Sequence, residues 1–144
     1  MSENSLVNLM LSHQVTFPWR SMSNFQHRTE VKVTSNRVDV VYFEQLNASG
    51  IGFIAAVEAK LHDWRKAIRQ AHRNKLFADR VYVAMPTQYA SAAIENISVF
   101  RQASIGLILV DNERSRIYYH PPMNTQRSSK HVIKVKQTLA SQNN

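Results

Sequence analysis

The sequence contains no cysteine, and this absence excludes two kinds of small protein. Without thiols the chain can form neither a disulfide framework nor a thiolate zinc site. It has only three Gly and four Pro, which excludes collagen-like and linker-rich chains. No apolar run reaches the ~18 residues of a transmembrane helix, and no basic and apolar leader begins the sequence. We therefore expect a cytoplasmic protein with no membrane partner.

The sequence also lacks the short motifs of several enzyme classes. It has no P-loop and no Gly-rich dinucleotide fingerprint, so no nucleotide cofactor is expected. No Gly-x-Ser-x-Gly segment supports a nucleophilic serine. The six histidines are not spaced as zinc ligands.

The length and the charge are more informative. The 144 residues, 44% of them hydrophobic, suit a single domain over 1–144, with a core over about 1–120 and a basic C-terminal extension over 121–144. Lys and Arg number 18 against 10 Asp and Glu, a formal charge of +8. This excess favours a polyanionic partner, DNA before an anionic membrane surface; a basic surface that only aids solubility is the alternative.

Apolar periodicity predicts six strands and three helices. The expected strands are 29–33, 38–43, 52–60, 81–85, 105–110 and 116–120. The expected helices run from about Leu6 to Ser12 or His13, over 62–78 and over 87–102, while 132–140 forms a short strand or helix. Residues 21–28 are expected to form a loop and 47–50 a turn. This order predicts an α/β fold with a mixed central β-sheet flanked by helices.

Charged residues interrupt two of the apolar strands. Asp39 lies inside the run 38–43, and Glu58 and Lys60 end the run 52–60. Burying charge is costly unless the charges are paired or hold a metal ion. Side chains two apart on a strand share a face, so Glu58 and Lys60 are expected to project together, with Asp39 beside them if the hairpin pairs in register. Two carboxylates would then suit a hard cation, Mg²⁺ or Mn²⁺.

The helix that follows Lys60 is strongly basic. Seven basic and two acidic residues lie between Lys60 and Arg80. Cations on this helix are expected to contact the phosphate backbone without reading base sequence. The expected nucleic-acid contacts are Arg65, Lys66, Arg69, Arg73 and Lys75.

These residues resemble the PD-(D/E)XK, or restriction-endonuclease-like, nuclease superfamily over roughly 37–120. Asp39 matches the family's Asp, Glu58-Ala59-Lys60 its Glu-x-Lys, and Gln70 looks like the helix Gln of the Holliday-junction-resolvase-like and RecB-like branches. The resemblance implies an α-β-β-β-α-β core. It also implies that Asp39 and Glu58 are metal ligands and that the catalytic residues are Asp39, Glu58, Lys60 and Gln70. The sequence departs from the family in three places: Val38 stands for the usual Pro, Asn74 stands for the RecB-like Tyr, and the first-helix acid has no clear match. Glu3 and Glu30 are the nearest candidates for that further acidic ligand.

The resemblance implies a Mg²⁺- or Mn²⁺-dependent endonuclease that hydrolyses DNA. Because 144 residues leave little room for a sequence-reading domain, we expect a homodimer, action on branched DNA, or a subunit of a DNA-processing or defence system. The alternatives are a non-catalytic module of the same fold that binds nucleic acid or protein, a plain surface ion pair between Glu58 and Lys60, and an Asp39 that only caps a turn or pairs with Arg37.

Overall fold

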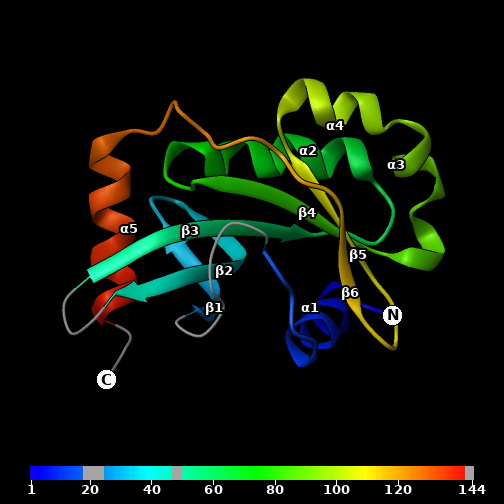
Figure 1. Cartoon of the computed structure of the whole chain (residues 1–144), viewed down its shortest axis with the longest axis horizontal. Coiled ribbons are helices and arrows are strands. Elements are labelled where there is room, and N and C mark those ends of the chain that lie inside the picture. Colours follow the sequence, from blue (N-terminus) through cyan, green and yellow to red (C-terminus); the bar gives the residue numbers. More distant parts are fainter. Residues whose placement is uncertain (18–24, 47–49, 142–144) are drawn as a thin grey trace.

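A six-stranded mixed sheet forms the centre of the molecule (Figure 1). The computed structural model describes residues 1–17, 25–46 and 50–141. The strands follow one another across the sheet in the order in which they occur in the chain. They are β1 (Phe25–Val33), β2 (Asn36–Leu46), β3 (Gly50–Ala59), β4 (Arg80–Pro86), β5 (Gly106–Val110) and β6 (Ser115–Tyr119). The strand pairs β1–β2, β2–β3 and β5–β6 are antiparallel, and β3–β4 and β4–β5 are parallel.

Helices cover both faces of this sheet, as the sequence predicts (Figure 1). The helices are α1 (Glu3–Ser12), α2 (Trp64–His72), α3 (Ser91–Glu95), α4 (Ile97–Ala103) and α5 (Ser129–Ser141), with 3-10 turns η2 (Arg73–Leu76) and η3 (Thr87–Tyr89). Leu6 and Met10 of α1 pack on one face of the sheet. The apolar sides of α2, α4 and α5 pack on the other. The fold is therefore α/β, with the expected mixed sheet between two helical layers.

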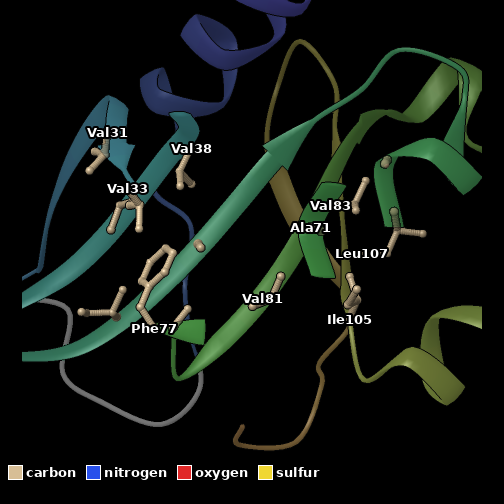
Figure 2. Close-up of a cluster of buried hydrophobic side chains, with 14 of the residues drawn as sticks. Val31, Val33, Val38, Ala71, Phe77, Val81, Val83, Ile105 and Leu107 are labelled. Carbon is tan, nitrogen blue, oxygen red and sulfur yellow. The ribbon is translucent and has the colours of Figure 1, made fainter. Parts of the chain in front are cut away.

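The larger apolar cluster fixes how α2 sits on the sheet. The apolar stripe of α2 contributes Trp64, Ala67 and Ala71, all buried. Figure 2 shows Ala71 of this helix together with Val81 and Val83 of β4 and the ring of Phe77. Burial of this stripe turns the basic side of α2 outward, because apolar and charged residues lie on opposite faces of the helix.

Two predicted segments differ from the structure. Residues 25–28, expected as part of a loop, extend β1, pairing Phe25 with Glu44 and Arg28 with Val41. Three of these four residues are polar, and β1 is an edge strand with much exposed surface, so pairing with β2 overrides their weak strand pattern. The rest of the expected loop (21–24) and residues 47–49 of the expected turn lie outside the described residues.

The expected helix over 87–102 is also divided. It consists of η3, α3 and α4, and the last break falls at Asn96. The Asn96 side chain donates to the carbonyl of Ala92 over 2.8 Å, which offers the backbone an alternative to continued helix. The expected helix over 62–78 is likewise shorter, since α2 tightens into η2 at Arg73.

The C-terminal segment forms the helix α5 and belongs to the core. Its Val135 and Leu139 are buried in the same cluster as residues of β1, β3 and α2. The expected boundary near residue 120 therefore does not separate an extension from a core. Within the described residues, no helix is both long and apolar enough to cross a membrane.

Candidate active site

The carboxylate of Asp39 lies where strands β2 and β3 stop pairing. The paired residues of these strands end at Val40 opposite Val57. Asp39 is the neighbour of Val40 in β2, and its Oδ2 accepts a hydrogen bond from the backbone N–H of Ala59 over 2.9 Å. The Asp39 side chain thus supplies an acceptor at a rung where regular pairing has ended. This bond places Asp39 beside the end of β3, as the hairpin register predicts.

Glu58 adjoins Asp39 and is almost fully buried. Its side chain lies next to Asp39, and burial raises the pKa of Glu58 from 4.5 to about 8, helped by the charge of Asp39 and a hydrogen bond between the two carboxyl groups. Glu58 has 5% of its surface exposed, so water stabilises its ionised form poorly. Without a cation, Glu58 therefore keeps its proton at neutral pH beside the carboxyl group of Asp39.

Asn74 contacts Glu58 from the opposite wall of the site. Its Nδ2 donates to Glu58 Oε1 over 3.1 Å, and Asn74 is itself buried. This bond stabilises the ionised form of Glu58 and lowers its pKa against the larger effect of burial. The sequence places Gln70 in this supporting role, but the structure places Asn74 there, one helical turn later.

Gln70 is half-buried on α2 and contributes a different contact. Its backbone carbonyl accepts from Arg73 Nε over 3.2 Å. Across residues 1–17, 25–46 and 50–141, its side-chain amide makes no hydrogen bond. Gln70 is therefore near the site in sequence but is not connected to either carboxylate.

Arg73 supplies positive charge at the border of the site. Its Nη1 donates to Asn36 Oδ1 over 2.9 Å, which ties the end of α2 to the start of β2. The guanidinium also lowers the pKa of Glu58, although burial of Glu58 outweighs it. Arg73 thus links the acidic site to the basic helix.

Lys60 follows the last residue of β3 and interacts with α1. Its backbone N–H donates to the carbonyl of Ala84 over 3.0 Å, and its Nζ lies 3.8 Å from Glu3 Oε2. Only 15% of the Lys60 side chain is exposed, so its position is well restricted. The Glu58 side chain accepts a hydrogen bond from Asn74, which follows α2, whereas the Lys60 side chain extends toward Glu3 of α1. The strand alternation expected from the Glu-x-Lys spacing therefore does not extend past the end of β3.

The residues present suit a hard divalent cation. Asp39 and Glu58 provide carboxylate oxygens, the ligands that Mg²⁺ and Mn²⁺ prefer, and Mg²⁺ in proteins is commonly held by one or two carboxylates together with water and substrate phosphates. A cation between the two acids would also relieve the repulsion that raises the pKa of Glu58. In the part of the chain that the structure describes, no group of three or more acids and histidines is placed to hold a metal ion. Glu3 and Glu30 therefore do not complete such a group with the pair.

Apart from Arg73, which borders the acidic site, the predicted nucleic-acid contacts divide into two sets. Arg65, Lys66 and Arg69 are exposed on α2, and the guanidinium of Arg65 stacks 4.3 Å from the centre of the Trp64 ring. Lys75 differs, because its ammonium donates to the carbonyl of Ala103 at the end of α4 and its partial burial lowers its pKa. Lys75 therefore ties η2 to α4 instead of extending the open basic face.

Two contributors were missed as site residues by sequence reasoning. Asn74 appears there only as a departure from a family motif, and Asn36 is not named there at all. The spacing of four from Gln70 predicts that Asn74 lies on the same side of a helix, but its contact with Glu58 depends on the tightening of α2 into η2. Nothing in the sequence identifies Asn36, because its contact with Arg73 spans 37 residues.

Comparison with known proteins supports the fold. No protein-family model matches the sequence, and no curated protein matches it. A solved structure, the SPO1766 protein of unknown function from Silicibacter pomeroyi, is similar over 83% of this chain and 76% of its own, with a TM-score of 0.57 and 18% identical residues. At this identity the similarity concerns the fold alone: a mixed α/β sheet flanked by helices.

Proposed function

We propose that this chain is a Mg²⁺- or Mn²⁺-dependent nuclease of the PD-(D/E)XK type that hydrolyses DNA phosphodiester bonds. The observation that carries the proposal is the adjacent pair of carboxylates, half-buried Asp39 and buried Glu58, at the point where the pairing of β2 with β3 ends. A binding module has no need of two acids in a buried sheet, since their repulsion and desolvation oppose folding. A cation site gives both acids a role.

Asp39 and Glu58 would hold the metal ion. When bound, such an ion supplies positive charge to a phosphate oxygen and lowers the pKa of a bound water. Asn74 fixes one oxygen of Glu58, and Asp39 lies next to the same carboxyl group. The Ala59 N–H fixes Asp39 in turn. Each acid thus accepts one hydrogen bond from an uncharged donor, which orients it toward the other acid's side of the site without adding negative charge.

Lys60 is proposed to act on the reacting phosphate. It lies two residues after Glu58, at the same end of β3, and its ammonium lies 3.8 Å from the half-exposed carboxylate of Glu3. Its charge would stabilise negative charge that develops on the phosphate oxygens, or orient the attacking water. We propose that Asn74 has the supporting role that the family resemblance assigns to Gln70.

The exposed cations of α2 are proposed to bind the DNA backbone. Arg65, Lys66 and Arg69 lie on α2, and Arg73, which directly follows this helix, adds positive charge next to Glu58. Phosphate contacts of this kind give affinity without base specificity. We therefore propose a nuclease that acts as a homodimer, on branched DNA, or with a partner protein that supplies specificity.

Cleavage assays test the proposal directly. Wild-type protein is incubated with supercoiled, linear, single-stranded and branched DNA, and with RNA, in Mg²⁺, Mn²⁺ or EDTA. We expect metal-dependent cleavage of DNA that falls by about 100-fold or more in Asp39→Ala and Lys60→Ala. Glu95→Ala and Lys130→Ala remove an exposed acid and an exposed lysine elsewhere, and they are expected to cleave as wild type does.

The alternative is the same fold used for binding alone. DNA binding without cleavage in any metal would favour that alternative and refute the nuclease proposal. Cleavage that survives in both Asp39→Ala and Lys60→Ala would also refute it, because the activity would then belong to another site or to a contaminant. Circular dichroism of each variant confirms that the fold is retained.

A further inference from the structure

Glu30 has a backbone conformation that is unusual for its place in the fold. Its φ is +52°, in the left-handed region that residues other than Gly seldom occupy. Among the described non-glycine residues, Thr34 and Ser104 share this feature, with φ of 56° and 54°. Thr34 lies in the turn between β1 and β2, and Ser104 ends α4, and both are ordinary positions for this conformation. Glu30 instead lies inside strand β1.

Glu30 is opposite Asp39. The pairs on either side are Thr29 with Val40 and Val31 with Val38. Counting inward from both pairs places Glu30 across from Asp39, and the register is the same before and after this rung. The strained residue and the candidate metal ligand therefore occupy the same rung of neighbouring strands.

Both strands change faces at this rung. In a regular strand, residues two apart point to the same face. Val40 is buried in the cluster under α1, whereas Val38 is buried in the cluster under α2. Val31, opposite Val38, is also in the α2 cluster, as Figure 2 shows. The half-turn that this change requires falls at Glu30 in β1 and at Asp39 in β2.

The change of face explains the position of the Asp39 carboxylate. In a regular continuation, β2 and β3 would keep pairing through their backbones, and Asp39 would stand perpendicular to the sheet. Instead the paired residues end at Val40, and Asp39 Oδ2 accepts from the Ala59 N–H. Strain of this type is found where surrounding structure holds it for a functional reason.

We propose that Glu30 is a positioning residue whose left-handed backbone places the half-turn at Asp39 and so directs the Asp39 carboxylate to the end of β3. The role rests on the backbone of Glu30, whose side chain is exposed. As a statement about metal binding, the inference rests on the proposed nuclease function. As a statement about where Asp39 lies, it does not.

Hydrogen exchange on the full-length ¹⁵N-labelled protein tests the placement without any assay of activity. The Ala59 amide reports the bond to Asp39, and the Ile54 amide, held by Asp79 Oδ2 over 2.8 Å, is the control on the same strand. Asp39→Ala sets the exchange rate expected when the bond is lost. Glu30→Val disfavours a positive φ, Glu30→Gly permits it, and Glu30→Gln keeps the backbone preference close to that of wild type.

In Glu30→Val we expect the Ala59 amide to exchange at least about tenfold faster than in wild type, approaching its rate in Asp39→Ala. The exchange rate of the Ile54 amide should change little. Glu30→Gly and Glu30→Gln are expected to match wild type. Mn²⁺ affinity, measured by calorimetry, should follow the same order, with a loss of about 10-fold to 100-fold in Glu30→Val alone. If the Val variant does not fold, Glu30→Ala replaces it, because alanine also disfavours positive φ but lacks the branched side chain.

The outcomes separate this inference from the proposed function. Unchanged Ala59 exchange in folded Glu30→Val or Glu30→Ala overturns the inference, whatever the cleavage assays show. Loss of Mn²⁺ binding in Glu30→Gln also overturns it, because the carboxylate itself would then be required. The expected exchange pattern in a protein that neither binds Mn²⁺ nor cleaves DNA supports the placement of Asp39 and refutes the nuclease proposal alone.

Discussion

The Ala59 N–H and Asp39 Oδ2 are joined by a 2.9 Å hydrogen bond between the main chain of β3 and a side chain of β2. Ala59 directly follows Glu58, so the segment that carries one acid also fixes the other. The position of the Asp39 carboxylate is therefore tied to the backbone of β3, next to Glu58. Substitutions that keep the shape of these acids are expected to change charge without moving the site.

The shared acids predict a specific dependence of stability on pH. Glu58 holds its proton up to about pH 8 in the folded protein, whereas a free carboxyl loses it near 4.5. Between these values the folded state binds more protons than the unfolded state, so the free energy of unfolding falls as pH rises and levels off above pH 8. Thermal denaturation in EDTA between about pH 5 and pH 9 measures this decline.

Glu58→Gln is the matched variant for that measurement. It removes the titrating group while keeping the side-chain shape, so it should flatten the decline and melt at a higher temperature than wild type at pH 8.5 in EDTA. Mg²⁺ or Mn²⁺ should raise the melting temperature of wild type more at pH 8.5 than at pH 5.5, since the cation binds the ionised acids, and should not raise that of Glu58→Gln. Equal pH profiles for the two proteins would show that Glu58 is not buried as described.

Asn74 and Gln70 form a second matched pair. Asn74→Ala removes the donor to Glu58 Oε1 and leaves a buried acceptor unsatisfied, so we expect a loss of about 1–3 kcal/mol in the free energy of unfolding and weaker Mn²⁺ binding. Gln70→Ala should change each by much less, because its side chain bonds neither acid. Urea denaturation and calorimetry measure both quantities. Larger losses in Gln70→Ala than in Asn74→Ala would show that Gln70, and not Asn74, supports the site.

Glu3→Gln tests the ion pair with Lys60. The pair is 3.8 Å long and Glu3 is about half exposed, so its loss should cost less than about 1 kcal/mol of stability. If Lys60 acts on the phosphate, freeing its ammonium leaves cleavage within about threefold of wild type, far from the loss expected of Lys60→Ala. A Glu3→Gln protein as inactive as Lys60→Ala would instead place Glu3 within the catalytic machinery.

The salt dependence of DNA binding tests the open face of α2. Each cation that contacts phosphate contributes about 0.9 to the slope of log affinity against log salt on duplex DNA. Replacing Arg65, Lys66 and Arg69 with Gln should reduce the slope by up to about three such contributions. Gln at Lys130, Lys134 and Lys136 of α5 removes the same number of charges and is the matched comparison. An equal reduction from the α5 variant would move the DNA contact away from α2 or make it non-specific.

Gly106 is predicted to be intolerant of any side chain. A Cβ at this position would lie 2.4 Å from the ring of Tyr82 and 2.7 Å from Pro121, both of which are held in the fold. Gly106→Ala should therefore destabilise the protein by about 1–3 kcal/mol through overpacking. Gly50→Ala is the control, since its nearest neighbour would be an ordinary 3.8 Å away. Equal melting temperatures for the two variants would contradict the close contact of Gly106 with Tyr82.

Much of the fold could be predicted from sequence because its elements follow simple periodicities. The six strands and the helices before residue 120 are indicated by local apolar patterns, whereas 132–140 is predicted only as a strand or a helix, and Asp39 and Glu58 stand out as acids within such patterns. The strand residues 25–28 could not be predicted, because only pairing with β2 makes them extended. The division near Asn96 depends on a side-chain bond to the backbone, which propensity alone does not reveal.

The site was less predictable than the fold, for a physical reason. The roles of Asn74 and Arg73 depend on α2 tightening into η2, which changes where those side chains point relative to Glu58. The direction of Lys60 depends on α1, more than fifty residues earlier in the chain. The half-turn at Glu30 involves no unusual residue type, since Glu has no special preference for a positive φ.

The strand order has a consequence for the way the chain acquires its structure. Each strand lies beside its predecessor, so the sheet can grow one strand at a time as the polypeptide leaves the ribosome, without waiting for distant partners. Helix α5 is the exception, because Val135 and Leu139 cover apolar residues of β1 and β3 that were synthesised about a hundred residues earlier. The nascent β1–β3 meander therefore remains open to aggregation or to a chaperone until the last helix is made.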